Sequence, residues 1–250
     1  MIMNEKKEAE RIISGETKEN KPSVIISLLS KYYIQIKKYS NSETKKLIIE
    51  NLLNQFPCLN THEWDEFINK AIKGAKKYPI KDIDKVPVTQ KEIDIIKSIP
   101  TKRLQKLAFA YLIVGKYNYL INGTSWVNAS FDSVMKMAGI HWTSKSKNGL
   151  DLHELLILKL ISSSKKIDDI KVKIEFIDPD GEEVLGIRTF KKLGWFWDRY
   201  LKNEVKICID CGEFFEVKGK SRRSKVRCDK CQHKTNLEKR RNIMKKSRSM

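Results

Sequence analysis

Two cysteine motifs near the end of the chain restrict its possible folds more than any other feature. Cys208 and Cys211 form one Cys-x-x-Cys motif, and Cys228 and Cys231 form a second after sixteen intervening residues. Two such pairs commonly hold one structural zinc ion, with each sulfur about 2.3 Å from the metal. Gly212 follows the first motif and can adopt the positive φ that a backbone wrapped around a sulfur needs. We therefore expect one structural Zn²⁺ bound by all four cysteines. Chance pairs or two disulfides are the alternatives.

The residues after the second motif indicate which kind of zinc finger to expect. Residues 232–246 are rich in helix formers and contain neither Gly nor Pro. A plain zinc ribbon would have a strand here, whereas a treble-clef-like finger has its second ligand pair on the first turn of a helix. The sequence therefore predicts a treble-clef-like zinc finger over residues 204–250, ending in a basic helix or tail. His233 is an alternative ligand.

The same region argues against an enzyme. Some treble-clef proteins are nucleases, which place a catalytic histidine between the ligand pairs to activate water beside a divalent ion. Residues 212–227 contain no histidine, and their acidic residues, Glu213 and Glu216, are expected on a strand. No phosphate-binding loop, nucleophile elbow or histidine pair occurs elsewhere. We therefore expect a protein without enzymatic activity and without catalytic residues.

The distribution of charge points to a nucleic-acid partner. Residues 202–250 carry 16 basic and 6 acidic side chains, so they hold +10 of the net charge of +19. Arginine is favoured where a planar fork must meet phosphate or guanine. An AT-rich genome is an alternative source of the lysines elsewhere. Phosphate contacts are expected from five arginines: Arg222, Arg223, Arg227, Arg240 and Arg241.

The middle of the chain has the pattern of a helix-turn-helix. Residues 131–137 predict a short helix, Gly139 a tight turn, and a second helix is expected to run from Thr143 or Ser144 to residue 161. This second helix would be held on the core by an apolar ladder of five leucines: Leu150, Leu152, Leu155, Leu156 and Leu160. Its first residues are polar, as in a recognition helix that enters the major groove. DNA contacts are expected from Thr143, Ser144, Lys145, Lys147 and Asn148.

A hairpin is expected to complete a winged helix within residues 91–203. Residues 170–176 alternate apolar and polar side chains, residues 178–181 contain turn-forming Pro and Gly, and residues 183–190 predict the partner strand. The aromatic helix around Trp197 is expected to pack on this domain, and base stacking by its rings is the alternative. Ordinary helix packing, or a winged helix that contacts protein, are the alternatives to DNA binding.

The remaining segments complete a mainly α fold with small β elements. Residues 1–21 are polar and predict a mobile arm or a short frayed helix. Residues 22–79 predict a helical unit of three helices. Residues 80–90 predict an extended linker, because Pro87 biases its neighbour away from a helix.

Composition also indicates where the chain works. No stretch approaches the roughly 18 apolar residues that a membrane span needs, and the charged N-terminus lacks the apolar core of a signal peptide. We therefore expect a cytoplasmic protein that does not contact a membrane. In a reducing cytosol, paired cysteines are more often metal ligands than disulfides.

Several motifs together carry a resemblance to a group of proteins. They are Arg103-Leu-Gln-Lys-Leu-Ala-Phe-Ala, Trp126-Val-Asn128, Met137-Ala-Gly139, the strand at residues 170–176 and the two cysteine motifs. Over about residues 15–240 the chain resembles uncharacterised phage and prophage proteins of low-GC Gram-positive bacteria. Residues 22–78 are also similar to the helical domain at the end of some plasmid and phage primases. The resemblance implies a mobile-element role in a bacterial host, near DNA replication or its control, and defines no catalytic residue.

These observations lead to one expected function and two alternatives. The expected function is a zinc-containing protein that binds double-stranded DNA, with the winged helix reading a site and the basic finger holding phosphates. The first alternative is an adaptor for a replication or transcription protein, with the finger as a structural cap. The second is RNA binding through the arginine-rich tail.

Overall fold

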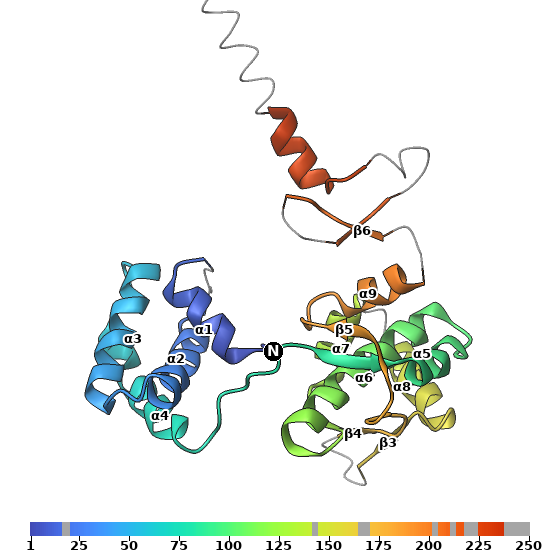
Figure 1. Cartoon of the computed structure of the whole chain (residues 1–250), viewed down its shortest axis with the longest axis horizontal. Helices are drawn as coiled ribbons and strands as arrows, with labels where there is room; N and C mark the ends of the chain where they lie inside the picture. Colours follow the sequence, from blue (N-terminus) through green and yellow to red (C-terminus); the bar gives the residue numbers. More distant parts are fainter. Residues whose placement is uncertain are drawn as a thin grey trace, which may run out of the picture. The chain divides into compact units, whose positions relative to one another are not determined.

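The computed structural model describes residues 1–16, 21–141, 145–164, 171–201, 205–210, 214–217 and 225–237. As predicted, the fold is mainly helical with small sheets (Figure 1). The chain forms two compact units. The first contains Met1–Pro87 and Gly186–Thr189, and the second contains Val88–Leu185 and Phe190–Met250. No helix in the described ranges is long and apolar enough to cross a membrane.

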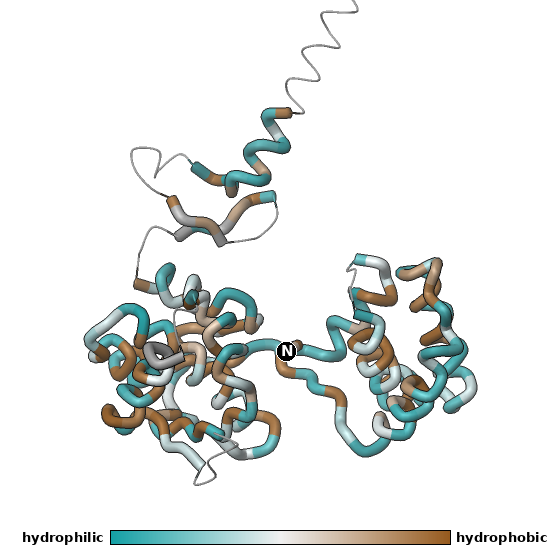
Figure 2. The backbone as a smooth tube through the Cα atoms, turned by 180° about the vertical axis from the view of Figure 1, so that it is seen from behind, coloured by the Kyte–Doolittle hydropathy of each residue, from teal (hydrophilic) through white to brown (hydrophobic). Residues whose placement is uncertain are grey.

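Helices surround the core of the first unit. They are α1 (Glu5–Ile13), α2 (Pro22–Lys31), the π-helical turn η1 (Tyr32–Ile36), α3 (Asn41–Gln55), the 3₁₀ turn η2 (Thr61–Trp64) and α4 (Asp65–Ala75). Hydrophobic and hydrophilic stretches alternate along these helices (Figure 2). The core consists of fully buried aliphatic side chains, chiefly Ile25, Ile26, Leu29, Ile48, Leu52 and Ile68.

Of the two alternatives predicted for residues 1–21, a mobile arm or a short frayed helix, the structure has a helix, α1, over Glu5–Ile13. Asn4 caps α1 by accepting a hydrogen bond from the Lys7 N–H (2.8 Å), and the α1 residues Ala9 and Ile12 are buried in the core of the unit. Glu5 pairs with Lys31 of α2 at 2.8 Å. Polar composition suggested an arm, but two apolar side chains three residues apart suffice to anchor one face of the helix. Residues 17–20 lie outside the described part of the chain.

The predicted linker at residues 80–90 has contacts of its own. Asn4 Nδ2 donates to Asp82 and to Asp84, each at 2.9 Å, so the beginning of this segment is attached to α1. Its end forms β1 (Val86–Thr89), and Thr89 then begins α5 (Gln90–Lys97) with a capping box.

A long central helix organises the second unit. α6 (Lys102–Asn122) is buried almost continuously from Leu107 to Tyr117. After it come β2 (Trp126–Val127), α7 (Phe131–Ala138), α8 (Lys145–Ile157), β3 (Ile161–Ser163), β4 (Val172–Ile174), β5 (Glu183–Ile187) and α9 (Leu193–Tyr200). Strands β2, β4 and β3 form an antiparallel sheet in that order, with Val127 opposite Val172 and Ser162 opposite Lys173.

The hairpin predicted between residues 170–176 and 183–190 does not form. β4 pairs instead with β3 and β2, whereas β5 pairs with β1. The predicted second helix also ends earlier than expected, at Ile157, because Lys159 has a φ of 56° and stops it before β3. The alternation at residues 170–176 correctly indicated a strand, but it contained no information about the partner strand.

The aromatic helix packs on this unit, as predicted. The Trp197 ring lies 5.4 Å from the Phe109 ring between centroids, and its Nε1–H donates to Gln105 Oε1 at 3.2 Å. Trp197 is fully buried. The indole ring is thus buried against another aromatic ring, and its single N–H donor has a hydrogen-bond partner.

A small finger follows α9. β6 (Val205–Ile207) and β7 (Phe214–Glu216) form an antiparallel hairpin in which Lys206 lies opposite Phe215. Residues 229–237 form a helix, which is predominantly hydrophilic (Figure 2). The predicted helix after the second cysteine motif is therefore present over its described residues.

Candidate metal centre and nucleic-acid interface

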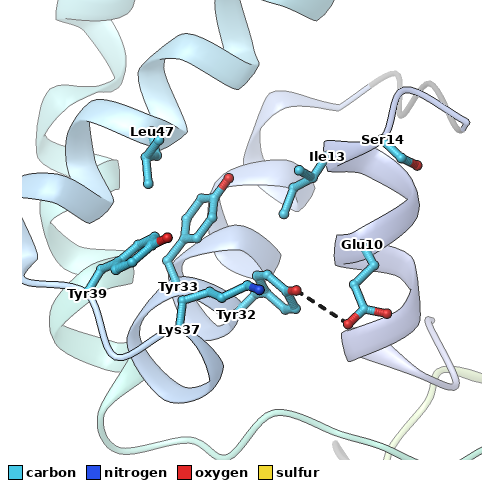
Figure 3. Close-up of a pocket in the computed structure, with 8 residues that line it drawn as sticks. All are labelled: Glu10, Ile13, Ser14, Tyr32, Tyr33, Lys37, Tyr39 and Leu47. Carbon is cyan, nitrogen blue, oxygen red and sulfur yellow. Dashed lines mark hydrogen bonds between the residues drawn. The ribbon is translucent and has the colours of Figure 1, made fainter.

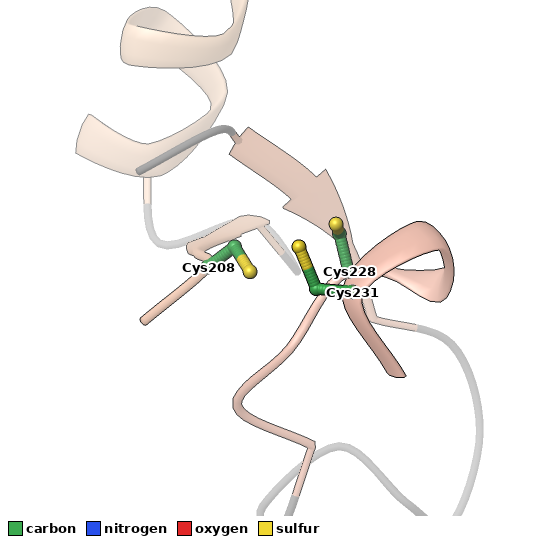
Figure 4. A group of neighbouring side chains, drawn as sticks. All are labelled: Cys208, Cys228 and Cys231. Carbon is green, nitrogen blue, oxygen red and sulfur yellow. The ribbon is translucent and has the colours of Figure 1, made fainter. Parts of the chain in front are cut away.

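Three of the four predicted metal ligands converge. Cys208 follows β6 in the hairpin turn, Cys228 precedes the helix at 229–237, and Cys231 lies in its first turn (Figure 4). Their sulfur atoms all lie within 4.8 Å of one another. Cys211 lies outside the described residues. Three thiol sulfurs at this separation could hold a metal ion, since sulfurs of a tetrahedral zinc site are about 3.8 Å apart.

Local hydrogen bonds bring these cysteines together. The Ile209 N–H donates to the Val226 carbonyl at 3.2 Å, which joins the hairpin turn to the segment before the helix. The Gln232 N–H donates to the Cys228 carbonyl at 2.9 Å, so Cys228 begins the helix. These two hydrogen bonds therefore help to bring the cysteine on the turn close to those at the start of the helix.

The finger has a very small apolar core of its own. Cys208, Phe215 and Val217 are buried, and Trp195 of α9 packs against them together with Cys228 and Cys231. A domain of this size rarely folds on apolar burial alone, and a bound metal commonly supplies the missing stability. The donor set and the small core both fit a structural metal site.

Arg227 has an acidic partner within the finger. Its Nε donates to Asp210 at 2.8 Å, and both side chains are partly exposed. This contact links the hairpin turn to the segment before the helix, a role that its sequence position did not reveal. The other arginines predicted to contact DNA lie outside the described residues: Arg222, Arg223, Arg240 and Arg241.

The structure describes part of the predicted recognition helix. Lys145, Lys147 and Asn148 lie in the first turn of α8, where the backbone alone is described. Thr143 and Ser144 lie outside the described residues.

An ion pair that sequence reasoning missed holds α8 on α6. Arg103 Nε donates to Asp151 Oδ2 at 2.8 Å, and Asp151 is almost fully buried. Leu155, one turn further on, is fully buried. An acidic residue inside an apolar ladder was the available signal for such a pair, since a buried carboxylate needs a partner.

The predicted apolar ladder is only partly buried. Of its members, Leu150 is 60% exposed, whereas Leu155 is fully buried. Ile157, which is not part of the predicted ladder, is 65% exposed. Leu150 and Ile157 are seven residues apart and so lie on one face of α8. This helix therefore presents two large apolar side chains to solvent.

α7 and α9 approach each other closely beside the turn before α8. Gly139 ends α7 with a φ of 65°, a conformation that suits glycine. A Cβ atom on Gly194 would lie only 1.9 Å from the Ala138 carbonyl oxygen. Glycine at position 194 thus permits α9 to lie against the end of α7.

Comparisons with protein families, with curated proteins and with solved structures found no match to this chain.

Proposed function

We propose that this chain is a zinc-containing, non-enzymatic protein that binds double-stranded DNA in the replication or replication control of a mobile element. The observation that carries the proposal is the connectivity of the second unit. Helix α6, strand β2, helices α7 and α8 and strands β3 and β4 follow one another, with the sheet order β2-β4-β3. A winged helix has this same succession of elements.

In this proposal α8 is the recognition helix and β3–β4 is the hairpin of the wing. Two helices joined by a short turn, the second with polar residues at its start, are the arrangement that places a helix N-terminus in the major groove. The expected DNA contacts come from the polar residues at its start: Thr143, Ser144, Lys145, Lys147 and Asn148. The basic finger adds phosphate contacts, which increase affinity without selecting a sequence.

Metal analysis combined with a DNA mobility shift tests this function. The purified chain should contain about one zinc per molecule, and a chelator that removes it should weaken binding to every duplex. Lys147→Ala and Asn148→Ala should change the preferred sequence instead. A zinc-loaded chain that ignores duplex DNA would overturn the proposal, and equal losses on all duplexes in both variants would overturn the role of α8.

A second candidate function is an adaptor for a replication protein. The exposed Leu150 and Ile157 on α8 favour it, because exposed apolar side chains gathered on one face are common at protein interfaces. Recovery of a helicase or primase on the immobilised chain, lost in Leu150→Lys/Ile157→Lys, would favour the adaptor if the purified chain does not bind DNA.

A further inference from the structure

The first unit has a pocket that the proposed DNA-binding elements do not use. Its volume is about 390 Å³, and it is lined by residues of α1, η1, the turn after η1 and α3. Tyr32, Tyr33 and Tyr39 line it together with Lys37 and Glu10 (Figure 3). This volume, and a mainly aromatic and apolar wall with few polar groups, are typical of small-ligand sites.

The backbone beside the pocket departs from a regular helix. In η1, the Lys37 N–H donates to the Tyr32 carbonyl at 3.2 Å, which is a π-helical hydrogen bond. Lys38 then has a φ of 59°, which is costly for a residue with a Cβ. The chain turns back, and the Tyr39 N–H donates to the Tyr33 carbonyl at 3.0 Å. Both π-helical turns and strained residues are common at functional sites.

This turn places an aromatic ring at the surface of the pocket. The Tyr39 ring is stacked on Tyr33, with centroids 5.9 Å apart and an angle of 25° between the rings. Tyr33 is buried, and its hydroxyl oxygen accepts a hydrogen bond from Asn51 at 3.1 Å. Burial raises the pKa of the Tyr33 hydroxyl. Tyr39 is 41% exposed and is therefore a supported platform for another planar ring.

Charged groups of both signs flank this platform. The Lys37 Nζ lies 5.7 Å from the centre of the Tyr32 ring, and within the described part of the chain no carboxylate forms an ion pair with Lys37 or Lys38. The Tyr32 hydroxyl donates to Glu10 Oε1 at 3.3 Å, which fixes the carboxylate at the pocket wall (Figure 3). A ligand with both an anionic group and a hydrogen-bond donor would match these two charged groups.

We propose that this pocket binds an unpaired nucleotide, with its base stacked on Tyr39 and its phosphate beside Lys37. Glu10 would accept a hydrogen bond from an exocyclic amino group of the base. Aromatic stacking with a nearby cation is how proteins hold unpaired bases. The proposal uses none of the residues assigned to duplex DNA and does not rest on that function.

Photo-crosslinking and binding measurements on the full chain test this site. A single-stranded DNA oligonucleotide containing 5-iodocytosine, which carries an exocyclic amino group, should crosslink at Tyr39, as mapped by mass spectrometry. Fluorescence anisotropy should show that Tyr39→Ala weakens single-strand binding about tenfold, the loss of one stacked base. Tyr39→Phe should retain the affinity, because it keeps the ring. Lys37→Gln should weaken binding without touching the core.

Tyr78→Ala is the matched control. Tyr78 is 58% exposed in the same unit and has Lys77 5.6 Å from its ring centre, but it does not line the pocket. Its variant should bind single strands like the parent chain. An equal loss in both alanine variants, an unchanged affinity in Tyr39→Ala, or crosslinks only at residues outside this pocket would overturn the proposal. Competition by deoxyadenosine monophosphate would identify a free nucleotide as the ligand, whereas competition only by oligonucleotides would identify a strand.

Discussion

At the scale of single residues, Gly194 is the position where a side chain is least tolerable. A Cβ there would meet the Ala138 carbonyl oxygen at 1.9 Å, and backbone cannot move aside as a flexible side chain can. We expect Gly194→Ala to lower the free energy of unfolding by about 1–3 kcal/mol, as overpacking does. Denaturant unfolding followed by tryptophan fluorescence measures this, because four of the five tryptophans lie in the second unit.

Gly149→Ala is the control for that substitution. Gly149 lies in α8, and a Cβ there meets nothing within 4 Å. Gly149→Ala should raise the free energy of unfolding by about 0.5–1 kcal/mol, because alanine is the better helix former. If both variants changed the free energy of unfolding equally, this would contradict the close approach of α9 to α7.

Lys116 is the second residue with a sharp prediction. Its ammonium group pairs with the buried Glu92 at 2.7 and 2.9 Å and donates to the Asp178 carbonyl at 3.1 Å. Lys116→Met would keep the packing of the stem but leave a buried carboxylate without its cation. We expect a loss of about 3–5 kcal/mol in unfolding free energy. Lys173→Met, which breaks an exposed pair with Glu175, should cost less than about 1 kcal/mol.

The cysteines give a third residue-scale prediction. Cys231→Ser should reduce bound zinc from about one ion per chain to a small fraction, because a hydroxyl replaces a thiolate ligand. Cys58→Ser should leave the metal content unchanged, since Cys58 is exposed in the first unit. Atomic absorption on the two purified variants measures both. Equal zinc content would exclude Cys231 as a ligand.

At the scale of secondary-structure elements, local sequence signals predicted where helices and strands lie better than they predicted which strands pair. Ser40 with Glu43 and Thr89 with Glu92 form the capping boxes that begin α3 and α5, and such signals are local in sequence. The partner of β4 is specified by packing on α6, where a Cβ on Gly115 would collide with Ile174. No local pattern encodes that contact, so the predicted hairpin was wrong although the strand itself was right.

The candidate metal centre was predictable for the same reason. Its ligands occupy a hairpin turn and a helix start, and both are recognisable from spacing and helix-forming residues alone. The pocket beside Tyr39 was not predictable in this way. Its shape depends on a π-helical turn and on a lysine with positive φ, neither of which has a sequence signature as distinct as Cys-x-x-Cys.

At the scale of the whole molecule, the net charge of +19 is unevenly divided, and residues 202–250 hold +10 of it. If these residues hold phosphates, each contact releases counterions, and about six contacts give a slope near −5 in a plot of log affinity against log salt. Arginines outside the described residues are predicted to make several of these contacts: Arg222, Arg223, Arg240 and Arg241. Replacing all four with glutamine should make the slope less steep by about 3–4.

A control of equal charge separates these contacts from a general effect of net charge. Four lysines in and just after α4 can be replaced with glutamine to remove the same charge from the first unit: Lys70, Lys73, Lys76 and Lys77. Duplex titrations between about 50 and 200 mM salt should show a reduced slope in the arginine variant and a nearly unchanged slope in the lysine variant. If both variants lose the same slope, the attraction comes from the charge of the whole chain. The finger would then have no specific role in holding phosphates.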